Sequence, residues 1–286
     1  MSTQIELLKK YGLSVRGYLG QHILIDPNIQ KKIVDALDPG PKDLVLEIGP
    51  GLGALTEQIL KRGSKVWAVE KDPRFAEILK GELGPAYKQQ LQVIHNDILD
   101  VKLERLLPRK QKASWKVISN LPYYITAPIL LHVLSYRKIV THAIFTMQKE
   151  VANRLKATPG TKDYGRLSLA VRYAADVHYL FDIPPTCFAP PPEVNSSAVE
   201  LVFHTGSQMP EEIDEGFLFY LIQLAFSARR KTLLHHLCHD PKIRRDRREL
   251  LDVLKKLGLP EKVRGEDLLL KDFFALASEL EQAVQK

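Results

Sequence analysis

The sequence predicts an α/β protein with a mostly parallel sheet whose last strands are antiparallel, followed by a smaller all-helical C-terminal domain. Three observations support this prediction. Short apolar segments alternate with helical patterns from Asp43 to His204, which is typical of parallel sheets. A glycine-rich segment, Gly49–Gly53, follows the first apolar segment, as in sheets that bind nucleotides. Beyond His204 apolar residues recur only at helical spacing.

The alternating part of the chain contains five predicted strands with helices between them. Asp72 and Pro73 mark the start of one helix, since aspartate is a common N-cap and proline suits the first turn. The predicted strands are Leu44–Ile48, Lys65–Glu70, Leu91–His95, Trp115–Ser119 and Ala143–Met147, and the predicted helices are Leu52–Arg62, Asp72–Leu83, Thr126–Tyr136, Gln148–Ala157 and Arg166–Ala175. The last strands, Val177–Ile183 and Ala198–Phe203, are expected to pair antiparallel around the proline-rich Pro184–Pro192.

A polar segment at 205–210 separates this part from a helical remainder. Four helices are predicted there, over Ile213–Arg229, Thr232–Cys238, Arg247–Leu257 and Leu268–Val284. We therefore expect a sheet domain with an N-terminal arm over residues 1–207 and a helical domain over residues 208–286.

Composition excludes several classes of protein. The chain is 45% hydrophobic and 26% charged, as in ordinary globular proteins, and no apolar run approaches the roughly 20 residues that span a bilayer. The N-terminus has no pattern of a secretion signal. Cys187 and Cys238 are too few and too scattered for a disulfide framework or a metal site. We expect a monomeric cytoplasmic protein with no membrane partner and no metal.

Most of the net charge of +7 lies in one short stretch. Residues 229–248 contain eight basic and two acidic residues, a local charge of +6. Such a stripe suits a polyanion, although many charge runs are solvated helix faces. The candidate RNA contacts are Arg229, Arg230, Lys231, Arg244, Arg245, Arg247 and Arg248.

The glycine-rich segment indicates a nucleoside cofactor. Glycines such as Gly49 and Gly51 allow a sharp turn and a close approach of a ligand, but dinucleotide enzymes use a similar loop. Here the spacing is G-x-G-x-G, and Pro50 removes an N–H group that a pyrophosphate would need. Glu47 precedes the loop and places an acid near a cationic ligand rather than a phosphate.

Two further acids follow the next strands. Glu70 can accept hydrogen bonds from two ribose hydroxyls, as acids also do in NAD sites. Asp97 can accept from an adenine amino group, or can simply cap a helix. With Glu47, these acids at successive strand ends predict a nucleoside site.

Asn120-Leu121-Pro122-Tyr123 follows the fourth strand, at the edge where such sheets bind ligands. The Asn120 side-chain oxygen and the Leu121 carbonyl can accept both N–H bonds of an exocyclic adenine amine, and so direct its lone pair at a methyl donor. Tyr123 offers a face on which an extruded base can stack. The segment therefore favours methyl transfer from S-adenosylmethionine over an ordinary turn.

With these motifs in order, the chain resembles the ribosomal RNA adenine dimethyltransferases, specifically the bacterial type that dimethylates two adjacent adenines near the 3′ end of small-subunit RNA. The resemblance runs from about Gly20 to Arg230. It is carried by Gly20-Gln21-His22-Ile23-Leu24, Glu47–Gly53, Asn120–Tyr124, Gln148–Leu155, Tyr164–Ser168 and Phe188–Pro192. It implies a Rossmann-like methyltransferase sheet, S-adenosyl-L-methionine as cofactor and ribosomal RNA in an immature small subunit as partner.

The resemblance also implies roles for single residues. Cofactor contacts are expected from Gln21, His22, Leu24, Glu47, Gly49, Gly51, Glu70, Asp97 and Asn120, and the target base is expected between Asn120, Tyr123 and Phe188. The family pattern usually has Gln-Asn-Phe-Leu where this chain has Gln21-His22-Ile23-Leu24. His22 can still donate a hydrogen bond, but its charge becomes sensitive to pH.

Four alternatives stay open at this stage. Erythromycin-resistance methylases share the fold and modify large-subunit RNA, but the segments at Tyr164–Ser168 and Phe188–Pro192 and the basic Ala228–Leu233 favour the small-subunit type. A DNA adenine methylase is the next enzymatic alternative. An NAD-dependent oxidoreductase would leave the Asn-Leu-Pro-Tyr segment unexplained, and a non-catalytic assembly factor would not need it.

Overall fold

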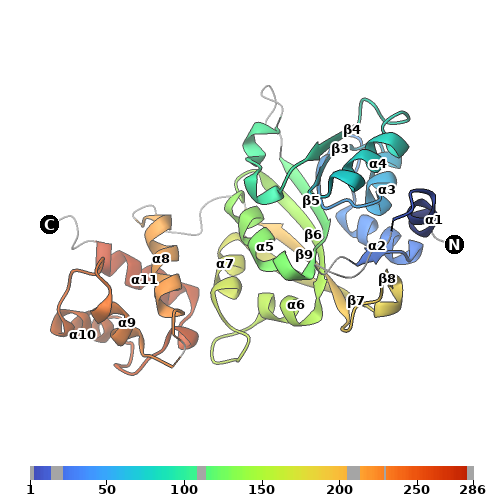
Figure 1. Ribbon diagram of the computed structural model, residues 1–286. Helices are drawn as coiled ribbons and strands as arrows, with labels where there is room; N and C mark the ends of the chain where they lie inside the picture. The colour runs from blue at the N-terminus through green and yellow to red at the C-terminus, as the bar shows by residue number, and fades with distance from the viewer. Residues whose placement is uncertain (1–2, 14–21, 108–113, 205–212, 229, 282–286) are drawn as a thin grey trace. The chain divides into compact units, whose positions relative to one another are not determined.

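The computed structural model describes residues 3–13, 22–107, 114–204, 213–228 and 230–281 (Figure 1). The chain divides into two compact units. The first comprises residues 1–152 and 175–205, and the second comprises residues 153–174 and 206–286. Among the described residues, no helix has the length and apolar character needed to cross a membrane.

The first unit is built on a seven-stranded sheet of strand order β4-β3-β2-β5-β6-β9-β7. The five strands from β4 to β6 are parallel, and β9 and β7 are antiparallel to their neighbours. Their bounds are β2 Leu44–Ile48, β3 Lys65–Glu70, β4 Leu91–His95, β5 Trp115–Asn120, β6 Val140–Gln148, β7 Ala175–Ile183 and β9 Ser196–Phe203. This order confirms the expected α/β fold, including the antiparallel last strands.

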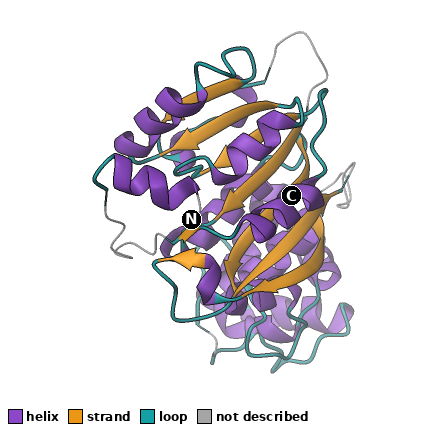
Figure 2. Cartoon of the chain, turned by 90° about the vertical axis from the view of Figure 1, so that its right-hand side faces the viewer, coloured by secondary structure: helices purple, strands orange, loops and turns teal. Residues whose placement is uncertain are grey.

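Helices pack along this sheet (Figure 2). The expected helices are observed as α3 Ala54–Lys61, α4 Pro73–Leu83, α5 Thr126–Ser135 and α6 Lys149–Lys156. Asp72 caps α4 as its sequence predicts, because its side chain accepts a hydrogen bond from the Arg74 N–H. Short single turns of helix also occur at Ile98–Asp100, Leu103–Arg105, Tyr123–Ile125 and Pro185–Cys187.

The N-terminal arm has structure that the sequence analysis did not anticipate. Helices α1 Thr3–Lys10 and α2 Pro27–Leu37 precede the sheet. The Asp26 side chain caps α2 with Pro27 in its first turn, the same aspartate–proline signal that predicts α4. The short strand β1 Ile23–Leu24 pairs antiparallel with β8 Phe188–Ala189. Through this pairing the N-terminal arm is hydrogen-bonded to the proline-rich segment between β7 and β9.

The second unit is helical, and it differs from the expected domain of residues 208–286, because it also includes residues 153–174. It contains α7 Arg166–Ala174, α8 Glu215–Ala225, α9 Leu233–His239, α10 Arg247–Lys256, a short turn at Gly265–Asp267 and α11 Leu270–Glu281. Tyr164, Leu169 and Tyr173 belong to the same apolar core as the C-terminal helices. Residues 153–174 therefore join this unit by packing, although they lie between sheet strands in sequence.

Candidate active site

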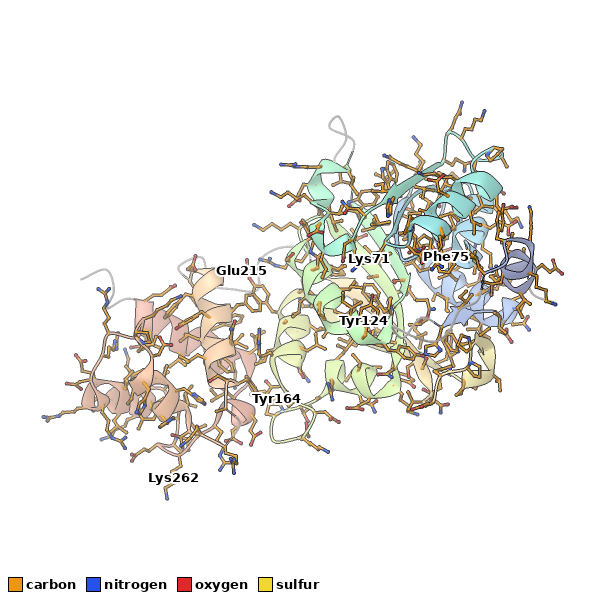
Figure 3. All side chains as sticks on the ribbon, viewed as in Figure 1. Lys71, Phe75, Tyr124, Tyr164, Glu215 and Lys262 are labelled. Atoms are coloured by element: carbon orange, nitrogen blue, oxygen red, sulfur yellow. The ribbon has the colours of Figure 1, made fainter. Side chains whose placement is uncertain are left out.

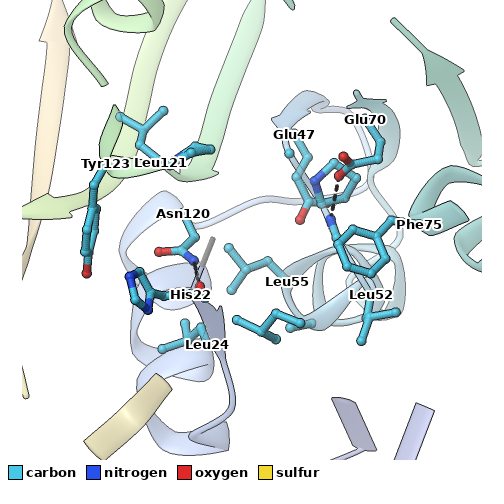
Figure 4. Close-up of a pocket in the computed structure, with 16 residues that line it drawn as sticks. His22, Leu24, Glu47, Leu52, Leu55, Glu70, Phe75, Asn120, Leu121 and Tyr123 are labelled. Carbon is cyan, nitrogen blue, oxygen red and sulfur yellow. Dashed lines mark hydrogen bonds between the residues drawn. The ribbon is translucent and has the colours of Figure 1, made fainter. Parts of the chain in front are cut away.

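A pocket lies at the carboxyl end of the parallel strands β2, β3 and β5, against the start of β1 (Figure 4). The strand register explains the convergence, since Ile48 pairs with Val69 and Glu47 pairs with Ile118. The next residues of all three strands therefore meet at one edge of the sheet. The lining residues are His22, Ile23, Leu24, Glu47, Gly49, Pro50, Gly51, Leu52, Ala54, Leu55, Glu70, Phe75, Asn120, Leu121, Pro122 and Tyr123.

The glycine loop turns at this edge through left-handed backbone conformations. Gly49, Gly51 and Gly53 have φ angles of 65°, 55° and 81°, which residues with a Cβ rarely adopt. A Cβ on Gly53 would lie 2.7 Å from the Leu79 side chain, so this position also lets α3 approach α4 closely. Nothing lies within 4 Å of a Cβ built on Gly49 or Gly51, which leaves their surfaces open to a ligand.

The glycine N–H groups of this loop are already used within the protein. The N–H groups of Gly49, Gly51 and Gly53 donate to Val69 O, Glu70 Oε2 and Pro50 O, each at 2.9 Å, and Pro50 has no N–H. A pyrophosphate site depends on free donors at this place. The loop therefore suits a ligand without phosphates.

Glu70 links the glycine loop to the turn that begins α4. Its two carboxyl oxygens accept from the Gly51 N–H at 2.9 Å and from the Asp72 N–H at 2.8 Å. Burial raises the pKa of Glu70, and these backbone hydrogen bonds oppose the rise. Each carboxylate oxygen keeps acceptor capacity for a second donor, so Glu70 can receive hydroxyl groups in the pocket.

Glu47 is the second acid of the pocket. The Thr56 hydroxyl donates to its Oε2 at 2.6 Å, and only 2% of the Glu47 surface is exposed. Burial raises the pKa of Glu47 to about 8, against the effect of the Thr56 hydrogen bond and with a smaller contribution from the nearby charge of Glu70. A cationic ligand would favour the ionised form of Glu47, and an anionic ligand would be repelled.

The Asn120 amide is held at both ends. Its Nδ2 donates to the His22 carbonyl at 2.9 Å (Figure 4). Its Oδ1 accepts from the Thr146 hydroxyl. The following residue is also anchored, because the Leu121 N–H donates to the Thr146 carbonyl at 2.9 Å. The turn that carries Asn120 is thus fastened to the neighbouring strand β6.

Tyr123 and His22 place two rings side by side in the pocket. Their centroids are 5.0 Å apart with an interplanar angle of 32°. The Tyr123 hydroxyl contacts the Ser196 hydroxyl at 2.5 Å, and His22 Nδ1 donates to the Pro190 carbonyl at 2.7 Å, since a carbonyl can only accept. Both rings are therefore fixed from outside the pocket. The neighbouring Tyr124 is 52% exposed (Figure 3).

Most of the expected site residues gather in this pocket. His22, Leu24, Glu47, Gly49, Gly51, Glu70, Asn120 and Tyr123 all line it. Gln21 lies outside the described residues. Asp97 does not line the pocket: its carboxylate caps a short turn through the Leu99 N–H and pairs with Lys71 at 2.7 Å. The Lys71 hydrogen bond lowers the pKa of Asp97.

Phe188 also lies away from the pocket lining. It is 2% exposed and packs in the apolar core of the first unit, paired through the backbone with Leu24. Its connection to the pocket is indirect, through the β1–β8 pairing and the His22–Pro190 hydrogen bond.

The apolar wall of the pocket was not predicted from the sequence. Leu52 lines it from the loop before α3, Leu55 from α3 and Phe75 from α4. Their only signal is position, because each follows a strand-end acid by a few residues. Thr56 and Thr146 were also missed, since hydroxyls that orient other side chains have no sequence pattern of their own.

The basic stripe lies in the helical unit, and its members differ in their surroundings. Arg245 donates to the Glu279 carbonyl, and Arg247 pairs with Glu261 at 2.7 Å. Arg230, Lys231, Arg244 and Arg248 are exposed, and no side-chain partner is found for them within the described residues. Arg229 lies outside those residues.

The fold and this pocket place the chain among the Rossmann-like methyltransferases. The sequence model of the family described as ribosomal RNA adenine dimethylase matches residues 12–274. The chain belongs to this family and is a ribosomal RNA methyltransferase.

Individual relatives agree with this assignment. "Ribosomal RNA small subunit methyltransferase A" of Halothermothrix orenii is 39% identical over 277 residues, which cover 96% of this chain and 91% of the relative. The protein of the same name from Pelotomaculum thermopropionicum is 41% identical over 283 residues, covering 95% and 93%. A solved dimethyladenosine transferase from Plasmodium falciparum superposes with a TM-score of 0.75 at 28% identity, covering 91% of this chain and 98% of that one. The 23S rRNA methyltransferase ErmE shares the fold, with a TM-score of 0.63 at 22% identity over 91% of this chain and 100% of that one.

Proposed function

We propose that this protein transfers methyl groups from S-adenosyl-L-methionine to the N6 amines of two adjacent adenines near the 3′ end of small-subunit ribosomal RNA. The observation that carries the proposal is the shared pocket of Asn120, Glu47 and Glu70. It joins a fixed amide acceptor to an acidic nucleoside site that has no glycine N–H left for phosphates.

The cofactor residues fit a cationic nucleoside. S-adenosylmethionine supplies an electrophilic methyl group on a positively charged sulfur. Glu70 would accept the ribose hydroxyls, and Glu47 would lie on the side of the positive charge. Leu52, Leu55 and Phe75 would exclude water from the apolar parts of the ligand. Asp97 would need to give up or share its contact with Lys71 to take part.

The target residues would orient the amine rather than deprotonate it. The lone pair of an exocyclic adenine amine is delocalised into the ring, so its nucleophilicity depends on geometry. Asn120 Oδ1 and the Leu121 carbonyl would accept its two N–H bonds, which directs the lone pair toward the methyl group. Tyr123 would stack on the extruded base. Phe188 would reach the base only after leaving its buried position, or would act by supporting β1.

The names of the relatives support the small subunit as substrate. Proteins called small subunit methyltransferase A are 39% and 41% identical over nearly the whole chain, whereas the 23S rRNA methyltransferase is 22% identical. We further propose that the protein acts as a monomer in the cytoplasm on an immature subunit. Contacts to RNA phosphates would come from the exposed members of the basic stripe.

The test is incubation of the protein with labelled S-adenosylmethionine and immature small subunits, followed by nucleoside analysis of both ribosomal RNAs. The expected product is N6,N6-dimethyladenosine in small-subunit RNA. Label confined to large-subunit RNA would support the erythromycin-resistance type instead. Binding of RNA without any transfer would favour an assembly factor, and saturable NAD binding without S-adenosylmethionine binding would favour an oxidoreductase.

A further inference from the structure

Thr146 contacts both residues whose oxygens would accept the hydrogens of the target amine, Asn120 and Leu121. It lies on β6, directly across from Asn120 in the parallel pairing of β5 and β6. Its hydroxyl donates to Asn120 Oδ1, and its carbonyl accepts the Leu121 N–H at 2.9 Å. Thr146 is fully buried and does not line the pocket, so it has no access to the substrate itself.

The contact decides where the acceptor oxygen lies. The His22 carbonyl accepts only from Nδ2 and therefore opposes a flipped amide, in which two oxygens would face each other. A single hydrogen bond still leaves the amide plane free to rock about it. The Thr146 hydroxyl adds the second fixed point, at Oδ1 itself. An amide oxygen has two lone pairs, so one remains for an N–H of the amine.

We propose that the Thr146 hydroxyl is a positioning group for methyl transfer, which holds Asn120 Oδ1 in line with the adenine amine. This proposal rests on the proposed function of Asn120. Loss of the hydroxyl leaves the acceptor present but less well aligned, and a misplacement of about 1 Å in an active site can cost a hundredfold in rate. Substrate and cofactor binding do not use Thr146 and should persist.

The test is Thr146→Val, which keeps the shape of the side chain and removes its hydroxyl. We expect kcat to fall by tenfold to a hundredfold, on the order given by misalignment, with KM for S-adenosylmethionine within twofold. Thr146→Ser restores the hydroxyl and should recover most of the rate. The matched control is Thr141→Val on the same strand, whose hydroxyl donates to the Trp115 carbonyl at 3.3 Å and should leave kcat unchanged.

If the valine variant does not fold, Thr146→Ser and Thr146→Ala form a second pair that differs only in the hydroxyl. Equal kcat values within either hydroxyl-differing pair would overturn the proposal, and so would an equal loss in Thr141→Val. A wild-type protein that methylates no adenine would instead overturn the proposed function. The two failures are therefore distinguishable in one set of assays.

Discussion

The Thr56 hydroxyl lies 2.6 Å from Oε2 of the buried Glu47 and donates to it. Burial nevertheless outweighs this hydrogen bond and raises the pKa of Glu47 to about 8. Without a ligand, the carboxyl group is therefore mainly protonated at neutral pH. A cation in the pocket would reverse this preference, so ligand binding and proton release should be coupled.

Glu47 should make the stability of the sheet unit depend on pH. In the unfolded chain its proton is lost near pH 4.5, but in the folded protein it is kept to about pH 8. The folded state binds more protons across this window, so the free energy of unfolding falls as pH rises through it. Glu47→Gln should flatten that decline, while Glu77→Gln, at an exposed site on α4, should not.

Tryptophan fluorescence during urea unfolding measures the stability of the sheet unit, which contains Glu47. Both tryptophans, Trp67 and Trp115, lie in the sheet with ring centroids 5.1 Å apart. Identical pH profiles for Glu47→Gln and the parent protein would show that Glu47 ionises near its ordinary pKa.

Asn120→Ala should abolish methyl transfer and leave the fold intact. It removes a fixed polar group that acts in the transition state, and such a loss costs roughly 2.7–4 kcal/mol of barrier. Turnover should be followed with labelled cofactor, with far-ultraviolet circular dichroism to check the fold. Asn153→Ala, at an exposed position of α6, is the control. Turnover of the Asn120 variant within tenfold of wild type would contradict its assigned role.

Glu70→Ala should weaken S-adenosylmethionine binding strongly. Hydrogen bonds to a charged acceptor contribute about 1.5–3 kcal/mol each, and the variant would also deprive the Gly51 and Asp72 N–H groups of their partner. Calorimetry gives the dissociation constant directly, and Glu77→Ala serves as the control. An unchanged constant would exclude Glu70 as a cofactor ligand.

The exposed arginines of α10 and the turn before it should contribute to RNA affinity. Each phosphate contact adds about −0.7 to the slope of log affinity against log salt for single strands. Arg244→Glu with Arg248→Glu should therefore weaken RNA binding and flatten the slope by about 0.7 for each lost contact. Cofactor affinity should hold, since the pocket is formed by residues of the other unit.

A control of equal charge separates contact from net charge. Lys262→Glu with Lys271→Glu changes two exposed lysines of the helical unit outside the stripe (Lys262 is labelled in Figure 3). If both double variants lower RNA affinity equally, the stripe acts only through overall charge. Wild-type affinity of the arginine variant at low and high salt would show that the stripe is a solvated face.

Local sequence determined much of this protein. Short apolar segments predict the strands because the strands of a parallel sheet, covered on both faces, are mostly apolar. Asp72-Pro73 marks the start of α4, and the glycine loop and the Asn120 turn stand at strand ends, where short-range rules place ligands. These features depend on neighbours in the chain, so sequence patterns reveal them.

Tertiary structure decided what depends on distant partners. Residues 153–174 pack with the C-terminal helices through buried side chains such as Tyr164 and Tyr173, which their place between strands in the sequence does not predict. Phe188 is buried and Asp97 is paired with Lys71 because of contacts that no spacing encodes. The protonation of Glu47 depends on its burial in the folded protein, against the hydrogen bond from Thr56 of the next helix. The alignment of Asn120 depends on the hydroxyl of Thr146, which folding brings close on the adjacent strand.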